Sequence, residues 1–146
     1  LLAYDLYPND EVKKIAEYVP LETLLAESDV ITLHTNATEE NHHLIDTKAI
    51  ERMKPGVTII NTARGKIIND TDLANALSSG RVGYAAIDVL AEEPPVHGSP
   101  LIEQPHCMVT PHIAWAPLQA RRRCMQIVED NIRAFQQGKP QNVVNP

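Results

Sequence analysis

Short apolar runs alternate along this chain with segments of helical spacing, and this alternation constrains the fold more than any other feature. Several runs are apolar throughout, which is typical of parallel strands that are buried on both faces. Buried strands joined by helices predict an α/β fold with a doubly wound parallel sheet, covered on both faces. The predicted strands are Leu1–Asp5, Tyr18–Val19, Val30–His34, Val57–Ile60, Tyr84–Val89 and His106–Thr110.

Capping residues and apolar spacing place the predicted helices between these strands. Asp46 can cap a helix that runs to Met53, and Asn69 or Asp70 can cap one that runs to Ser79. Gly80 then supplies the left-handed residue that ends the second of these helices. Apolar residues three or four apart predict further helices over residues 9–17, 21–27 and 118–137.

Composition excludes several classes of function. The chain has 146 residues, 43% of them hydrophobic, and a formal net charge of −6, which suits one domain with a core and no nucleic-acid partner. No stretch approaches the length of a membrane span and no signal peptide opens the chain, so we expect a soluble cytoplasmic protein without a membrane partner. Cys107 and Cys124 are expected to be buried reduced thiols, and the histidines lack metal-ligand spacing, so no metal site is predicted.

An arginine and three other ionisable residues follow the ends of predicted strands. Arg64 lies in Asn61–Gly65, directly after a predicted strand, and Asp88, Glu93 and His112 lie at or just beyond later strand ends. In open α/β sheets this end of the strands is where ligands bind. A guanidinium offers a fixed fork of donors that suits a carboxylate or an α-keto acid. Alone, Arg64 would be interpreted as a surface residue; together, these residues predict a site.

The set suits the reduction of an α-keto acid. Such a reduction requires groups that hold the carboxylate, polarise the carbonyl and protonate the new alkoxide. Arg64 can do the first two, and a protonated His112 can do the third. A carboxylate from Glu93 would favour the charged imidazolium.

Residues after earlier strands are candidates for holding a dinucleotide. Asp5 ends the first predicted strand, where an acid can accept both ribose hydroxyls of NAD and repel the 2′-phosphate of NADP. The glycine-rich fingerprint GxGxxG that should precede such an acid is absent from this sequence. His34 ends another strand on the ligand side, so its backbone is expected to line the cofactor groove.

Three motifs resemble those of the D-isomer-specific 2-hydroxyacid dehydrogenases and keep that family's order. They are Asn61–Gly65, then Ala86–Val89 with Glu93-Pro94, then Thr110–Ile113. The match runs from Tyr4-Asp5 to Asn142–Pro146. The resemblance implies a Rossmann-like NAD-binding domain.

By this resemblance Arg64 would bind substrate, His112 would be the acid/base and Glu93 its carboxylate partner. Asp88 would meet the nicotinamide amide and Asp5 the adenosine ribose. The full set implied to bind NAD is Asp5, His34, Thr35, Asn36, Thr62, Ala63, Arg64, Asp88, His112 and Ala114.

Two positions refine the resemblance. His34-Thr35-Asn36 stands where the family usually has His-Cys-Pro, so the details of adenine packing are expected to differ. Trp115 directly follows Pro111–Ala114 and resembles the glycerate dehydrogenase (hydroxypyruvate reductase) branch. The resemblance therefore favours a small 2-hydroxy or 2-keto acid of this type as substrate.

The resemblance also predicts the domain organisation. Residues 1–146 would be the later part of the NAD-binding domain, with the glycine-rich first βα unit and the substrate domain outside this sequence. The first strand of the domain would lie between Leu1–Asp5 and Val30–His34. The full-length protein would be a homodimer, and the piece alone is expected to be inactive.

Two other functions remain open from the sequence. One is a non-catalytic NAD-sensing interaction module of the co-repressor type, because some such relatives keep Arg64, Glu93 and His112. The other is a structural remnant that binds neither cofactor nor substrate. Turnover of hydroxypyruvate or glyoxylate, and titration with NAD, separate these three possibilities.

Overall fold

A computed structural model describes residues 1–145, and it divides the chain into two compact units. The first unit is Leu1–His112 and the second begins at Ile113. Pro146, the last residue of the resemblance quoted above, lies outside the described residues.

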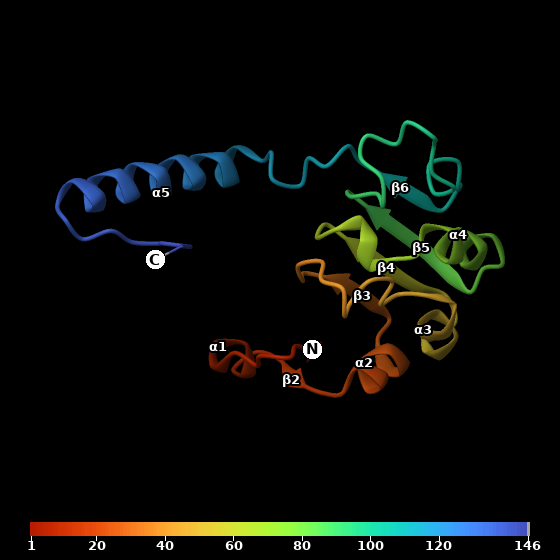
Figure 1. Cartoon of the computed structure of the whole chain (residues 1–146). Helices are drawn as coiled ribbons and strands as arrows, with labels where there is room; N and C mark the ends of the chain where they lie inside the picture. The colour runs from red at the N-terminus through yellow and green to blue at the C-terminus, as the bar shows by residue number, and fades with distance from the viewer. Residues whose placement is uncertain (146) are drawn as a thin grey trace. The chain divides into compact units, whose positions relative to one another are not determined.

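A four-stranded parallel sheet forms the centre of the first unit (Figure 1). Its strands lie in the order β3 (Val30–Leu33), β4 (Val57–Asn61), β5 (Val82–Ile87) and β6 (Cys107–Val109). The last residues of the strands are in register, since Leu33 pairs with Asn61, Asn61 with Ile87, and Ile87 with Val109. The predicted α/β fold with a parallel sheet is confirmed, and all four strands end in one row.

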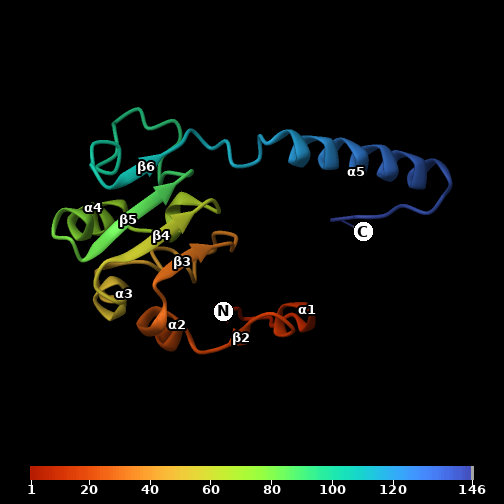
Figure 2. The same ribbon diagram turned by 180° about the vertical axis from the view of Figure 1, so that it is seen from behind.

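Three helices gather on one side of this sheet: α2 (Leu21–Glu27), α3 (Thr47–Arg52) and α4 (Asp70–Ser78) (Figures 1 and 2). The predicted caps are present. Asp46 Oδ1 accepts the N–H of Ala49 at 2.8 Å, and Asn69 Oδ1 accepts the N–H groups that open α4. Asn69 rather than Asp70 is therefore the cap of α4.

Alternate residues of each strand face these helices and form the core. Val57, Ile59 and Asn61 of β4 are buried, as two-residue periodicity requires for one face of a strand. The core also contains Ile31 of β3 and Ile87 of β5. The alternation that buries the core side chains of β4 thus also places the side chain of Asn61 on the buried face.

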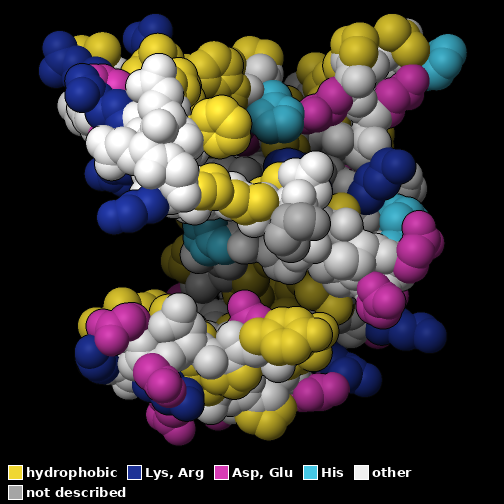
Figure 3. Space-filling model, turned by 60° about the vertical axis from the view of Figure 1, so that its left-hand side comes forward, with side chains coloured by type: hydrophobic (Ala, Val, Ile, Leu, Met, Phe, Trp, Pro, Cys, Tyr) yellow, Lys and Arg dark blue, Asp and Glu magenta, His cyan; other side chains and the backbone are white. Residues whose placement is uncertain are grey.

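Within the first unit, residues on the opposite face of the sheet have exposed side chains. Val30, Tyr84 and Met108 are 57%, 60% and 69% exposed. Hydrophobic side chains at the molecular surface are yellow in Figure 3. Within the first unit, the helices that pack on the four-stranded sheet lie on its other side.

A separate two-stranded sheet pairs β1 (Leu2–Ala3) with β2 (Glu17–Tyr18) in parallel. Between them, α1 (Asp10–Lys13) is shorter than the helix predicted over residues 9–17. Asn9 caps it, and its Oδ1 accepts the N–H of Glu11 at 2.8 Å. The prediction was wrong at its end because Glu17 and Tyr18 pair with β1, so the chain must leave the helix before them.

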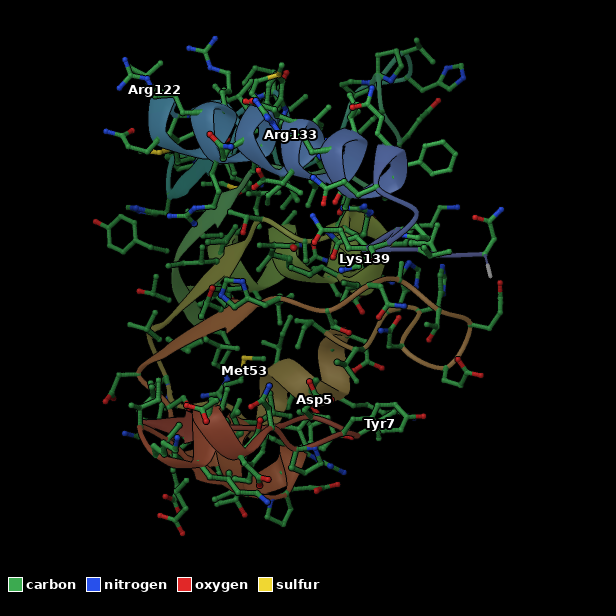
Figure 4. The ribbon with its side chains drawn as sticks, turned by 90° about the vertical axis from the view of Figure 1, so that its left-hand side faces the viewer. Asp5, Tyr7, Met53, Arg122, Arg133 and Lys139 are labelled. Atoms are coloured by element: carbon green, nitrogen blue, oxygen red, sulfur yellow. The ribbon has the colours of Figure 1, made fainter. Side chains whose placement is uncertain are left out.

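The second unit contains α5 (Leu118–Gln136), which closes at Gly138 with φ +69°. None of the nineteen described residues of α5 is buried. Figure 4 labels Arg122 and Arg133 on this helix, and Arg133 pairs with Glu129 at 2.7 Å. Across the described residues, no helix combines the length and apolar character needed to cross a membrane.

The two cysteines differ in exposure. Cys107 is half-buried in β6, and burial raises the pKa of its thiol to about 11, with the charge of Asp70 adding to the shift. Cys124 is exposed on α5, so the expectation of burial is wrong for this residue. Both thiols are free.

The connection from β5 to β6 is a long loop that contacts α4 at its first residue, Asp70. Leu101 anchors it with a fully buried side chain, and Ser99 Oγ donates to Asp70 Oδ2 at 3.2 Å. Burial raises the pKa of Asp70, while its hydrogen bonds from the loop oppose this rise. Because Glu93 lies in the same loop, these anchors also hold the segment that carries it.

Replacing Leu101 by Ala should lower the free energy of unfolding by about 2–5 kcal/mol, because a buried leucine leaves a cavity. The neighbouring residue supplies a matched control: Ile102 is 50% exposed, so Ile102→Ala should cost less than about 0.5 kcal/mol. Urea denaturation of the two variants measures the difference. Equal losses would show that Leu101 does not anchor the loop.

Candidate active site

Loops that follow the ends of neighbouring strands meet at one edge of the four-stranded sheet. Backbone hydrogen bonds continue the ladder beyond the strands: Asp88 N–H donates to Asn61 O, and His112 N–H donates to Asp88 O, both at 2.9 Å. These bonds link the loop after β4, which carries Arg64, to those after β5 and β6. The structure thus brings the loops of Arg64, Asp88 and His112 together at the predicted edge.

His112 and Glu93 form the central pair of this edge. His112 Nδ1 lies 2.9 Å from Glu93 Oε2, and both side chains are partly exposed, 44% and 36% respectively. The second carboxylate oxygen, Oε1, accepts the N–H of Leu90 at 3.0 Å. Glu93 is therefore held by the backbone of its own loop while it orients the imidazole, as carboxylates do in acid/base pairs.

The backbone of His112 has an uncommon conformation. Its φ is +52°, in the left-handed region that a residue other than glycine seldom adopts. Its N–H donates to Asp88 O and also to Thr110 O at 3.0 Å, so this conformation is fixed from two sides. Backbone of this kind persists where the surroundings determine it, and it is concentrated at functional sites.

Asp88 is a buried acid, only 4% exposed. Thr110 Oγ1 donates to its Oδ1 at 2.5 Å, which compensates part of the cost of burying a charge. An acceptor fixed in this way, at the ligand edge of a parallel sheet, suits the amide group of a nicotinamide. Thr110, which the sequence did not predict as a site residue, is what fixes it.

Arg64 is exposed and lies in the turn that connects β4 with the short 3-10 helix η1 (Gly65–Ile67). Its Nη1 donates to Ala63 O at 2.6 Å. The turn is closed from inside by Asn61, whose side chain accepts from Ala63 N–H and donates to Arg64 O, each at 3.0 Å. The guanidinium therefore belongs to a turn with defined internal bonds.

The turn after β4 also packs closely against the loop after β5. A Cβ atom on Gly65 would lie 2.0 Å from the carbonyl carbon of Leu90, so only glycine fits there. Leu90 is the residue whose N–H holds Glu93. The segment of Arg64 and the segment of Glu93 are thus in direct backbone contact.

The remaining predicted cofactor residues of the first unit follow β3 and β4. Thr62 is exposed and Ala63 is half-buried. After β3, His34 Nε2 lies 2.9 Å from Thr32 Oγ1, and Asn36 O accepts from both Thr35 and Asn41 side chains. Small, accessible side chains beside a buried carboxylate fit a dinucleotide that binds across the ends of parallel strands.

One predicted residue of the first unit lies outside this edge. Asp5 follows β1 in the separate two-stranded sheet, where its Oδ1 accepts Tyr7 N–H at 2.8 Å (Figure 4). Ala114 belongs to the second unit. The structure therefore does not join Asp5 to the four-strand edge. No cluster able to hold a metal ion occurs among residues 1–145.

Sequence reasoning missed Asn61, Gly65 and Thr110 as parts of the site. One signal could have found Asn61. It lies two residues after Ile59 and four after Val57, so the alternation of the strand places its amide on the buried face. A buried amide requires hydrogen-bond partners, and the nearest candidates are the backbone groups of the turn that follows.

Comparisons with known proteins agree with this geometry. Residues 1–114 match the family described as D-isomer specific 2-hydroxyacid dehydrogenase, NAD binding domain. A hydroxypyruvate reductase of Blautia hydrogenotrophica and a glycerate dehydrogenase of Methylorubrum extorquens are each 42% identical over 146 residues, covering 99% of this chain and 45% of the relative. The chain thus spans about 45% of the length of these relatives.

Solved structures show the same likeness. The NAD-complexed D-isomer specific 2-hydroxyacid dehydrogenase of Lactobacillus delbrueckii ssp. bulgaricus superposes with a TM-score of 0.88 at 28% identity, over 99% of this chain and 48% of that one. A D-lactate dehydrogenase of Treponema pallidum gives 0.85 at 34% identity, over 95% and 46%. The chain belongs to the D-isomer specific 2-hydroxyacid dehydrogenase family, and it carries that family's NAD-binding domain.

Proposed function

We propose that this protein is an NAD-dependent oxidoreductase that interconverts a D-2-hydroxy acid and its 2-keto acid, of the glycerate and hydroxypyruvate type. The observation that carries the proposal is the His112–Glu93 pair at 2.9 Å, on the edge where the loop of Arg64 also lies. An acid/base pair beside an arginine supplies the groups that this reaction needs. A homodimer and a cytoplasmic location stay predictions.

Each residue of the edge has a defined part in the proposed reaction. NAD supplies or accepts the hydride when it is bound. Arg64 would hold the substrate carboxylate and polarise the carbonyl, and His112 would give a proton to the developing alkoxide oxygen. In the oxidative direction a neutral His112 would accept that proton. Glu93 would stabilise the charged ring and keep it oriented.

Three residues would position the nicotinamide. The buried Asp88 carboxylate would accept a hydrogen bond from the amide, and Thr62 with Ala63 would line the same side of the groove. Both segments lie at the carboxyl ends of adjacent strands, where dinucleotides bind in open α/β sheets.

The finer substrate assignment rests on Trp115 and on the two relatives at 42% identity, a hydroxypyruvate reductase and a glycerate dehydrogenase. Several structural neighbours are D-lactate dehydrogenases, so pyruvate is the substrate to compare. Measuring kcat/KM with NADH for hydroxypyruvate, glyoxylate and pyruvate tests the proposal, and hydroxypyruvate should give the highest value. NAD binding without any turnover would instead support the non-catalytic co-repressor type. The absence of both NAD binding and turnover would support a structural remnant.

Arg64→Lys should severely reduce kcat/KM for the keto acid although the charge is kept, because a point charge cannot reproduce the bidentate fork. The affinity for NADH should stay nearly unchanged. Arg52→Lys is the matched control, since Arg52 is an exposed arginine in α3 whose ion pair with Glu22 is long, at 3.8 Å. Steady-state kinetics of both variants decide the role, and an active Arg64→Lys enzyme would make Arg64 structural.

Glu93→Gln should move the reductive limb of the pH–rate profile to lower pH. Reduction needs the imidazolium of His112, and an ionised Glu93 at 2.9 Å favours this charged form. The glutamine keeps size and hydrogen bonding but removes the negative charge that stabilises the imidazolium. Oxidation, which needs the neutral ring, should extend to lower pH.

Profiles in both directions for wild type, Glu93→Gln and Glu92→Gln measure this effect. Glu92 is the exposed neighbour in the same loop and should leave both limbs in place. An unmoved reductive limb in Glu93→Gln would show that Glu93 does not tune the histidine.

The protein should prefer NADH to NADPH, because the Asp5 carboxylate would repel a 2′-phosphate. Asp5→Ser removes that charge and should reduce the preference for NADH over NADPH. Asp10→Ser, which removes an exposed carboxylate from α1, is the control. The measurement is the ratio of kcat/KM for the two reduced cofactors; a preference that Asp5→Ser leaves unchanged would remove Asp5 from this role.

A further inference from the structure

A single buried amide organises the turn that carries Arg64. Asn61 is fully buried at the end of β4. Its Oδ1 accepts Ala63 N–H, its Nδ2 donates to Arg64 O, and its main-chain oxygen accepts Asp88 N–H. Both polar atoms of the amide and the main-chain carbonyl are therefore used within the candidate site.

These bonds divide the turn into a fixed inside and an accessible outside. Asn61 holds the backbone from within, while Thr62 and Arg64 are exposed. The guanidinium is fastened to the same turn through its bond to Ala63 O. The contact of Gly65 with Leu90 prevents the turn from shifting toward the next loop.

We propose that Asn61 is a positioning residue. Its amide sets the direction of the Arg64 guanidinium and the position of Thr62 and Ala63 relative to Asp88. Asn61 itself would touch neither substrate nor cofactor. This inference rests on the proposed function for its kinetic consequence. Its structural part, the fixed turn, can be measured without any turnover.

The variant Asn61→Asp distinguishes the role of the amide nitrogen, which donates, from that of the amide oxygen, which accepts. An aspartate has nearly the same shape and still accepts Ala63 N–H, but it places an acceptor against Arg64 O where the amide donates. Asn69→Asp is the matched control. Asn69 uses only its oxygen, which accepts Thr71 and Asp72 N–H at 3.1 and 3.2 Å, so an aspartate there keeps both bonds.

At pH 8, Asn61→Asp should lower kcat/KM for hydroxypyruvate by about 10–100-fold, the scale on which small displacements of a binding group act. KM for the keto acid should rise, while the dissociation constant for NADH, measured by fluorescence, should stay within about threefold of wild type because the remaining cofactor contacts are kept. Asn69→Asp should stay within about twofold in each quantity, since aspartate and asparagine cap helices equally well.

Lowering the pH should partly restore the Asn61→Asp variant relative to wild type. A protonated carboxyl is again a donor toward Arg64 O, and burial raises the pKa of a carboxyl at such a position. The charged or titratable groups on the neighbouring loops are Arg64, Asp88, Glu93 and His112, and all four are present in wild type and variant alike. Asn61→Ser is the second variant: it replaces the amide by a shorter hydroxyl and adds no titratable group, so its loss of kcat/KM relative to wild type should not change with pH.

Hydrogen exchange tests the turn independently of activity. The amides of residues 61–67 should exchange faster in Asn61→Asp than in wild type at pH 8, with no such change in Asn69→Asp. Kinetic values for Asn61→Asp within about twofold of wild type, a pH-independent loss, or unchanged exchange over residues 61–67 would each overturn the proposal. If wild type reduces no keto acid, the proposed function fails, and exchange alone decides the role of Asn61.

Discussion

The register between β4 and β5 is the constraint on which the candidate site depends. Asn61 pairs with Ile87, so the next residues of both strands leave the sheet side by side. A slip of one residue would turn Asn61 from the buried face to the exposed one and would move Arg64 to the opposite side of its turn. The core side chains Val57 and Ile59 oppose such a slip, because they would lose their burial together with it.

The acid/base pair depends on a different kind of support. Glu93 belongs to a long irregular loop, and loops of this length are ordered only when their own side chains or hydrogen bonds anchor them. Leu101 provides an apolar anchor, Ser99 a polar one, and Leu90 N–H holds the carboxylate directly. The ends of the strands thus position His112 and Arg64. Glu93, the partner of His112, is instead positioned by a loop that buried side chains and hydrogen bonds anchor.

The sequence predicted those parts of the fold that local patterns determine. Apolar runs located β3 and β4, and Asp46 and Asn69 located the starts of α3 and α4. The end of α1 was not predictable from helical spacing, because the pairing of Glu17 with Leu2 is a contact between distant residues. Cys124 was expected to be buried because it lies on a predicted helix and belongs to no metal-binding motif, but a helical pattern does not by itself specify which residues are covered.

The site was predictable as a set of residue types and not as a bonded network. Arg64, Asp88 and His112 follow strand ends, and parallel strands place such residues at one edge. The bond from Thr110 to Asp88 and the amide of Asn61 depend on side-chain directions that spacing alone does not give. The left-handed backbone of His112 likewise depends on a tertiary hydrogen bond, from its N–H to Asp88 O, that no local pattern predicts.

The close approach of Gly65 to Leu90 has a consequence for attempts to redesign substrate range. There is no space for even a methyl group between Gly65 and Leu90, so we expect a displacement of the loop after β5 to displace the loop after β4. Lengthening or reshaping the loop of Glu93 to admit a bulkier substrate acid would therefore displace Arg64 as well. A library that varies both loops together, with the glycine kept constant, is the design that this packing permits.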